Sequence, residues 1–261
     1  MKLHRIYAIV LRNLFVFKRN FDRWFDAFFN PTLELIIWGI TSSYVSSFAP
    51  QFHTYVLIII SAISFWFVVT RSQYETNVAL LEDIWSRNLI NLFTSPLRYF
   101  EWVLGVLVIG IIKALATFIF AGIVAFVLYK IELISYGFYL IPFLLLLLTT
   151  GWWSSFMITA AIMRFGTRVQ TFAWTLIFLL GPFSGIYYPV SSLPSWAQII
   201  SKFIPTSYVF EGMRELIQTG SVDPQKIIIS LLLNLIYLCI GIFLLYHSYK
   251  KLLERGMLQL Q

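Results

Sequence analysis

Long apolar runs alternate with short polar segments along the 261 residues of the chain. A helix needs about 20 predominantly apolar residues to cross the hydrocarbon core of a bilayer. Six runs come near this length, and they predict transmembrane helices at residues 28–48, 54–70, 102–129, 137–163, 169–188 and 227–248. The pattern therefore predicts an all-α polytopic membrane protein with a single transmembrane domain over residues 1–261.

Residues 1–26, ahead of the first run, are amphipathic. Apolar residues from Leu3 to Phe25 recur at alternating steps of three and four, which places them on one stripe of a helix. Basic residues occupy the opposite stripe: Arg5, Arg12, Arg19 and Arg23. This pattern predicts a helix that lies in the membrane interface, and packing against the protein's own cytoplasmic loops is compatible with that location.

The longest loop between the predicted spans covers residues 71–100. Its apolar residues share one stripe at helical spacing: Val78, Leu81, Trp85, Leu89 and Leu92. Pro96 ends the pattern, because the residue before a proline avoids the helical conformation. We predict a short helix at residues 79–95, parallel to the membrane, which either caps the bundle or docks a cytoplasmic partner.

The stretch from Gly181 to Arg214 is apolar and aromatic, but prolines interrupt it at positions 182, 189, 194 and 205. Proline removes a backbone hydrogen bond from a helix, so this stretch cannot be one spanning helix. Between the breaks, Trp196, Ile199 and Phe203 recur at helical spacing. Broken backbone survives in hydrocarbon only where protein buries it or where it lines a cavity. The sequence therefore predicts a re-entrant helical hairpin at residues 189–218, between spans five and six.

Charge is scarce and unevenly placed. Charged residues make up 12% of the chain, against about a quarter in soluble domains. The net charge of +7 would suit a nucleic-acid partner, but the basic residues flank the apolar runs, where they act as topology signals. With the N-terminus inside, fourteen Lys and Arg residues fall on the inner side and four on the outer side. This asymmetry predicts cytoplasmic termini and an outer hairpin.

The sequence holds few groups for catalysis. It contains no phosphate-binding GxxxxGK[ST] loop, no GxSxG, no HExxH and no pair of cysteines, since Cys239 is the single one. The three histidines, His4, His53 and His247, belong to different regions, so we expect no metal site. Two charged residues fall inside predicted spans, Glu34 and Lys113. Such residues are costly in a membrane, and we expect structural roles for both.

Two ordered motifs resemble the permease subunits of type 2 (ABC-2) ATP-binding-cassette exporters, in the drug-resistance and polysaccharide-export group. The first comprises Ser184-Gly185-Ile186-Tyr187-Tyr188-Pro189, Leu193-Pro194-Ser195-Trp196, Pro205, Tyr208, Glu211 and Arg214. The second, with Leu89, Leu92 and Phe93-Thr94-Ser95-Pro96-Leu97, resembles the family's coupling helix. It departs from the family pattern where Arg87-Asn88 replaces Gly-Thr and where Ile90 replaces an acidic residue.

The resemblance implies a mechanism and partners. Two copies would pair, as a homodimer in membrane lipid, around a shared path, and each would bind a separate ABC ATPase that holds ATP and Mg. The chain itself would have no cofactor and no enzymatic activity. Its cargo would be an amphipathic drug-like molecule or a lipid-linked glycan, exported across the inner membrane of a prokaryote.

The same resemblance assigns three sets of candidate residues. Those expected to couple the chain to the ATPase are Leu81, Glu82, Asp83, Trp85, Arg87, Leu89, Leu92 and Pro96. Those expected to form an outer gate are Gly185, Tyr187, Tyr188, Pro189, Pro194, Trp196, Glu211 and Arg214. Those expected to line the path, along spans one, two and five, are Glu34, Trp38, Phe65, Trp66, Trp174 and Phe178.

Two other classes of protein remain as alternatives. A membrane enzyme acting on lipid-linked substrates would use converging acids, and the outer side offers Glu211, Glu215 and Asp223. A channel or secondary transporter would work without an ATPase and would show internal repeats. No clear repeat relates residues 1–130 to residues 131–261.

Overall fold

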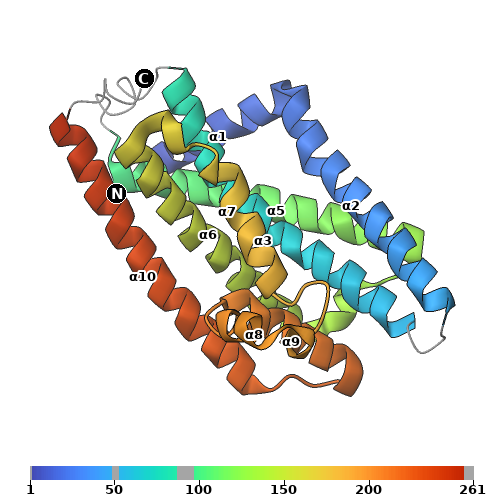
Figure 1. The fold of residues 1–261 in the computed structure, drawn as a ribbon. Coiled ribbons are helices and arrows are strands. Elements are labelled where there is room, and N and C mark those ends of the chain that lie inside the picture. Colours follow the sequence, from blue (N-terminus) through green and yellow to red (C-terminus); the bar gives the residue numbers. More distant parts are fainter. Residues whose placement is uncertain (1, 49–52, 87–96, 256–261) are drawn as a thin grey trace.

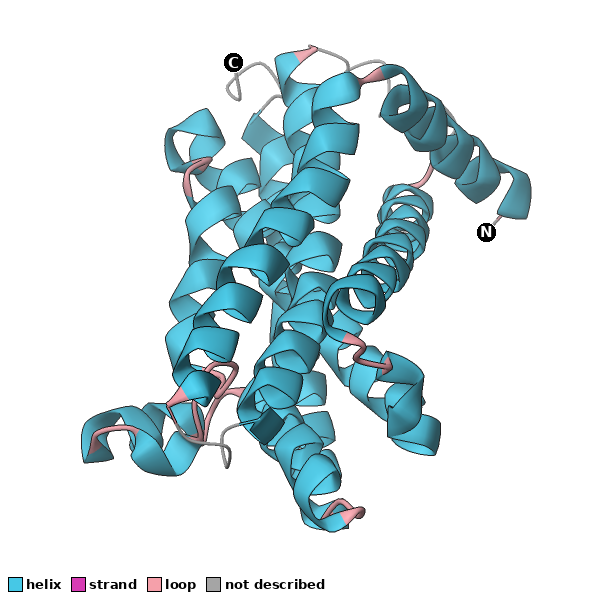
Figure 2. Cartoon of the chain, turned by 90° about the vertical axis from the view of Figure 1, so that its right-hand side faces the viewer, coloured by secondary structure: helices cyan, strands magenta, loops and turns pink. Residues whose placement is uncertain are grey.

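The computed structural model describes residues 2–48, 53–86 and 97–255, and over these ranges it is helical without a β-strand (Figures 1 and 2). The α-helices are α1 (Leu3–Arg19), α2 (Phe21–Ser47), α3 (His53–Trp85), α5 (Tyr99–Tyr129), α6 (Leu140–Phe165), α7 (Phe172–Leu180), α8 (Ser195–Ser201), α9 (Pro205–Thr219) and α10 (Pro224–Arg255). Short 3-10 helices occupy Leu133–Tyr139, Gly166–Val169, Gly181–Phe183 and Val190–Ser192.

The long helices form one bundle (Figure 1). Helix α3 packs against α2, α5 and α6, and α10 packs along α6. Helices α8 and α9 lie at one end of the bundle, whereas α1 and the C-terminal end of α10 lie at the other end (Figure 1). In the described part of the chain, α1 and the segment that contains α8 and α9 therefore lie at opposite ends of the bundle.

Four helices are long and apolar enough to cross a membrane, namely Thr54–Trp85, Tyr99–Tyr129, Leu133–Phe165 and Pro224–Leu252. Helix α2 has 27 residues, which is sufficient length. Its composition is more polar, however, because Asn30, Glu34 and four serines interrupt the apolar residues. The predicted all-α membrane architecture is therefore confirmed. Helix α2 is long enough but less apolar than these four helices, and α7 is too short to cross a membrane by itself.

The predicted fifth span at residues 169–188 is wrong as one continuous helix. Helix α7 has nine residues, which gives a length of about 14 Å, and a 3-10 turn follows it at Gly181–Phe183. Gly166, with φ of 73°, ends α6 just before this segment. Pro182 then falls in the turn that ends α7. The segment at residues 169–188 is consequently broken rather than one regular helix.

Helix α3 corrects a second prediction. The sequence analysis ended a span at residue 70 and began a separate helix at residue 79, but α3 continues through both points to Trp85. No glycine or proline occurs between residues 53 and 86, so the chain contains no helix breaker there. The second half of the predicted coupling helix, residues 87–95, lies outside the described residues.

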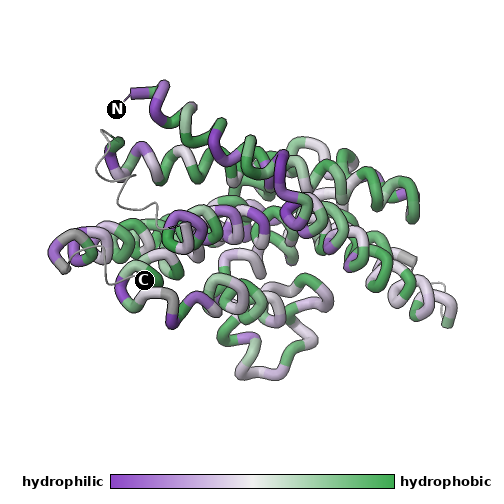
Figure 3. The backbone as a smooth tube through the Cα atoms, turned by 90° about the horizontal axis from the view of Figure 1, so that it is seen from above, coloured by the Kyte–Doolittle hydropathy of each residue, from purple (hydrophilic) through white to green (hydrophobic). Residues whose placement is uncertain are grey.

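The N-terminal stripe belongs to two helices rather than one. Helix α1 ends at Arg19, and Asn20 then caps α2 by accepting a hydrogen bond from the backbone N–H of Arg23 at 3.4 Å. Helix α1 packs against α5, where the side chain of Ile9 lies against Gly105. Hydrophilic residues recur along this first helix, in contrast to the apolar helices of the bundle (Figure 3).

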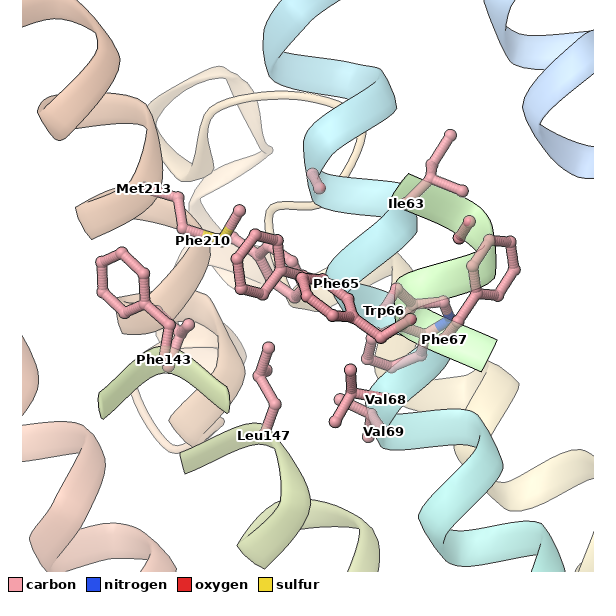
Figure 4. Packing of buried hydrophobic residues seen from close by; sticks show 14 of the residues in the cluster. Ile63, Phe65, Trp66, Phe67, Val68, Val69, Phe143, Leu147, Phe210 and Met213 are labelled. Carbon is pink, nitrogen blue, oxygen red and sulfur yellow. The ribbon is translucent and has the colours of Figure 1, made fainter. Parts of the chain in front are cut away.

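The apolar core is centred on α3. Phe65 and Trp66 are buried there with Phe143 of α6 and Phe210 of α9 (Figure 4). A small residue brings α3 and α6 together, because a Cβ added at Gly151 would lie 2.8 Å from the carbonyl oxygen of Val69. Small residues allow close helix packing in membranes, where there is no hydrophobic force between helices.

Candidate functional site

A cavity of about 260 Å³ lies between α2, α3, α5 and α7. Its polar side chains come mainly from α2 and α3: Asp26, Asn30, Glu34, Thr70, Arg71 and Gln73. Its aromatic side chains come from α3 and α7: Trp66, Phe67, Tyr74, Trp174 and Phe178. A space with both kinds of lining can hold a ligand that has a polar head and an apolar body.

The cavity brings together most of the residues predicted to line a path. Four of them line it: Glu34, Trp66, Trp174 and Phe178. Trp38 instead stacks on Tyr187, a predicted gate residue in the segment after α7, with ring centroids 4.4 Å apart. Phe65 is completely buried in the core and packs edge-on against Phe143, so it is not part of the lining. The role of these residues in transport stays a prediction.

A buried network of charges adjoins the cavity. The Arg71 guanidinium lies 2.7 Å from the Asp26 carboxylate and 3.2 Å from that of Glu75. Lys113 Nζ lies 2.5 Å from the second Glu75 oxygen and 4.5 Å from the centre of the Phe17 ring. Lys113 is therefore paired inside the bundle, as charged residues within membrane spans usually are, and its structural role stays a prediction.

The sequence analysis missed Glu75 because it placed this residue in a loop beyond span two. The signal that identifies it is the absence of a helix breaker after residue 70. In the continuous α3, Arg71 and Glu75 are four residues apart and face the same side. Lys113 of α5 then meets the acidic member of that pair.

Helix α1 turns most of its basic stripe toward the protein. Arg5 pairs with Glu101 at 3.2 Å, and Arg12 pairs with Asp83 at 3.1 Å. These two arginines therefore pack on the protein, which is compatible with the predicted interfacial location of the helix. Both acids are buried, and each arginine places a positive charge beside one of them. The interfacial location itself stays a prediction.

The predicted coupling residues at the end of α3 differ in exposure. Leu81 is fully buried, and Asp83 is buried while it accepts a hydrogen bond from the Trp102 indole at 3.3 Å. Glu82 pairs with Arg23 of α2. Trp85 is 52% exposed, which leaves it available to a partner. The remaining predicted coupling residues, Arg87, Leu89, Leu92 and Pro96, lie outside the described residues.

Three predicted gate residues meet in one hydrogen-bonded cluster. The Glu211 carboxylate accepts hydrogen bonds from the backbone N–H of Val190 at 2.8 Å and from Arg214 at 2.7 Å. Arg214 also donates to the Gly185 carbonyl at 2.9 Å. Gly185 has φ of 72°, a conformation that favours glycine. This cluster ties the turn after α7 to helix α9.

The other gate residues shape the hairpin locally. The Tyr188 hydroxyl donates to the Pro182 carbonyl at 2.8 Å. Pro189 and Pro194 are the residues that precede the short helices Val190–Ser192 and α8. Trp196 packs edge-on against Phe183 and is 61% exposed. Exposed apolar residues of this kind on α8 suit contact with a membrane surface.

The acids that the enzyme alternative would use are held by structural partners. Glu211 pairs with Arg214, as above. Glu215 accepts hydrogen bonds from the Asp223 backbone N–H at 3.1 Å and from Lys226 at 3.0 Å, which hold the pKa of Glu215 below its ordinary value. Asp223 in turn caps α10 by accepting from the Gln225 N–H at 2.9 Å. Among the described residues, no group of three metal-binding side chains converges.

Comparison with known protein families identifies the class. A family model described as ABC-2 family transporter protein matches residues 29–246, which is most of the chain. The protein is therefore a multi-pass membrane permease component of an ABC transporter. It belongs to the ABC-2 transporter family, whose permeases associate with ABC ATPase subunits and are not themselves ATPases. A search of curated proteins gives no match.

Proposed function

We propose that this permease exports amphipathic or lipid-linked molecules, drug-like compounds or lipid-linked glycans, from the cytoplasmic side to the outside. The observation that carries the proposal is the cavity between α2, α3, α5 and α7, which combines charged and aromatic side chains inside an apolar bundle. Polar groups inside a membrane bundle are costly. A cavity lined by them therefore belongs more often to a substrate pathway than to the packing of the bundle.

The proposed topology has six crossings, made by α2, α3, α5, α6, the broken α7 segment and α10. Both termini then face the cytoplasm of a prokaryotic cell, and the permease lies in the inner membrane. The distribution of Lys and Arg supports this orientation, since fourteen fall on the side of the termini and four on the side of the hairpin. Helices α8 and α9 would cover the outer end of the path.

The proposed assembly contains two permease copies and two cytoplasmic ATPases. ATP and Mg would be bound by the ATPases, and closure of the ATPases would act on the end of α3 and on the residues that follow it. Trp85 is the exposed aromatic residue at that end. The ion pairs of α1 with Asp83 and Glu101 would carry the movement of this end to α1 and α5.

The outer cluster of Gly185, Glu211 and Arg214 would act as a gate. It links the turn after α7 to α9, so movement of α7 would change its hydrogen bonds. Trp38 of α2 stacks on Tyr187 of the same turn, so movement of α2 would also reach the gate.

Purification of the tagged chain from its native membrane tests the proposal. We expect an ATPase with a phosphate-binding loop to co-purify and the complex to hydrolyse ATP. Lipid vesicles that contain the complex should accumulate or release a fluorescent amphipathic substrate only when ATP is supplied. Absence of any ATPase in the purified material would refute the assembly, and transport without ATP would favour a channel.

A further inference from the structure

The charges around the cavity do not cancel. Asp26, Arg71, Glu75 and Lys113 form a network of two acids and two bases, joined by contacts of 2.5–3.2 Å. Glu34 lines the same cavity but is not part of this network. In the part of the chain that the structure describes, no ion pair joins Glu34 to a basic side chain. Arg23 is a further base beside this network, and it is paired with Glu82, so the cavity has one carboxylate in excess.

Glu34 lies where the cavity meets the outer hairpin. Its hydrogen-bonding neighbour is the hydroxyl of Tyr187, and that ring stacks on Trp38. Burying a carboxylate without a charged partner is unfavourable. A cation inside the cavity would relieve this cost, because an opposite charge within a few ångströms favours the ionised carboxylate.

The aromatic walls favour the same kind of ligand. Trp66 and Trp174 line the cavity from α3 and α7, and Phe178 lies about one turn beyond Trp174. The faces of aromatic rings carry partial negative charge and attract organic cations, most strongly at Trp. Such a wall also accommodates the apolar body of an amphipathic molecule.

An anionic ligand would fit the cavity poorly. Arg71 is the single basic residue that lines it. Both of its carboxylate partners lie within 3.2 Å. An anion placed there would compete with Asp26 and would also meet the uncompensated Glu34.

We propose that the cavity binds an organic cation with an apolar body, and that Glu34 and the two tryptophans recognise its charge. This inference rests on the proposed function in one respect, namely that the bound cation would be transported. Binding at equilibrium can be measured without an ATPase. A chain that recruits its ATPase but does not bind a cation would overturn this inference alone. A chain that binds the cation but recruits no ATPase would overturn only the proposed exporter.

The test measures binding of radiolabelled tetraphenylphosphonium to the full chain in phosphatidylcholine nanodiscs, with binding to protein-free nanodiscs subtracted. We expect saturable binding. Phenyltrimethylammonium should displace the label, whereas benzenesulfonate, a water-soluble anion of similar size, should not. These measurements use the unaltered protein, so they decide the sign of the preferred charge even if every variant misfolds.

Three variants then assign the site. Glu34→Gln should weaken binding of the labelled cation about tenfold, because it removes the excess charge and keeps the shape. Trp174→Leu should weaken it about threefold, since the π face is lost and an apolar side chain remains. Glu132→Gln removes an exposed acid outside the cavity and should leave binding unchanged. Displacement by the sulfonate, absence of saturable binding, or unaltered affinity of a folded Glu34→Gln protein would each overturn the proposal.

Discussion

At the scale of single residues, three of the charges inside the described bundle are held by partners of opposite charge. Lys113, Glu75 and Arg71 are each less than 10% exposed, and each has an oppositely charged neighbour. Loss of one partner leaves an uncompensated buried charge, which costs more than the pair itself contributes. The network consequently acts as a set of mutually dependent residues that connects α2, α3 and α5.

Replacement of Lys113 tests this dependence. We expect Lys113→Met to lower the free energy of unfolding by about 3 kcal/mol, because Glu75 keeps only its contact with Arg71. The double variant Lys113→Met/Glu75→Gln should lose less than the sum of the two single variants. Unfolding by denaturant in lipid bicelles measures all three proteins. Additive losses would show that the two residues do not interact.

Gly185 offers a second test at this scale. Its φ of 72° disfavours any side chain, and an added Cβ would lie 3.2 Å from Val190 Cγ2. Gly185→Ala should therefore lower the free energy of unfolding by about 1–2 kcal/mol. Gly181→Ala is the matched control, since its φ is −50° and an added Cβ would come no closer than 3.9 Å to Trp66. Equal effects of the two substitutions would contradict the conformational argument.

At the scale of helices, the sequence predicted which long helices form better than it predicted where they begin and end. The apolar runs placed the long helices α3, α5, α6 and α10, because burial in a bilayer demands such runs. An apolar run ends at the first polar residues, however, whereas a helix can continue through them. Helix α3 continues past Arg71 because partners on α2 and α5 pair with its charged residues. The failure at α7 has the opposite cause. Its sequence is apolar, but α7 ends at Leu180, and Pro182 falls in the 3-10 turn that follows.

The packing of α1 against the bundle can be tested with a disulfide. A Cβ at position 105 would lie 2.8 Å from Cβ of Ile9, which is closer than the roughly 3.5–4.5 Å of a disulfide, so a shift of α1 by about 1 Å would let cysteines at both positions bond. In a Cys239→Ser background, Ile9→Cys/Gly105→Cys should cross-link rapidly under mild oxidation. Adding Arg5→Gln and Arg12→Gln should slow cross-linking several-fold, because these arginines hold α1 to Glu101 and Asp83.

The exposed Arg19 provides the control for that experiment. Arg19→Gln removes the same charge from the same helix and should leave the rate of cross-linking unchanged. A similar slowing by all three substitutions would indicate a general effect of charge rather than the two specific ion pairs.

The turn between α9 and α10 should respond to acid. Hydrogen bonds from Asp223 and Lys226 hold the pKa of Glu215 below its unfolded value. Stability from this carboxylate is thus fully present above the unfolded pKa of about 4.3 and is lost as the pH falls through the lower folded pKa. Melting temperatures measured below pH 4.5 should fall with decreasing pH, and Glu215→Gln should flatten this dependence. An identical acid profile in the variant would exclude Glu215 as its source.

At the scale of the whole molecule, the parts of the candidate site were predictable and their assembly was not. The residues themselves singled out Glu34 and the prolines of the hairpin, since charges and prolines stand out in an apolar sequence, whereas Trp174 came from the family resemblance. The meeting of Glu211, Arg214 and Gly185 depends on a chain reversal that no local pattern records. The basic stripe of α1 likewise gave no sign that its partners are Asp83 and Glu101, which come from distant helices.

The last prediction concerns how the molecule engages its ATPase. Trp85 ends α3 with 52% of its surface exposed, and α3 lies at the centre of the bundle against α2, α5 and α6. A force applied to Trp85 would therefore reach the cavity through one rigid helix. Exposed tryptophans are frequent anchors of protein interfaces, where truncation commonly costs 2 kcal/mol or more. We expect Trp85→Ala to reduce the co-purified ATPase by at least about tenfold, with normal insertion of the permease in the membrane.

Trp196→Ala separates this contact from a general loss of an exposed aromatic side chain. Trp196 is 61% exposed on α8, and α8 lies at the end of the bundle opposite to the C-terminal end of α3, where the chain has Trp85 (Figure 1). Its replacement should leave the recovered ATPase unchanged, because a cytoplasmic partner cannot reach both ends. If Trp196→Ala removed the ATPase and Trp85→Ala did not, the proposed orientation of the permease would be reversed, and the hairpin would be the docking surface. The pair of variants thus tests the docking site and the topology in one measurement.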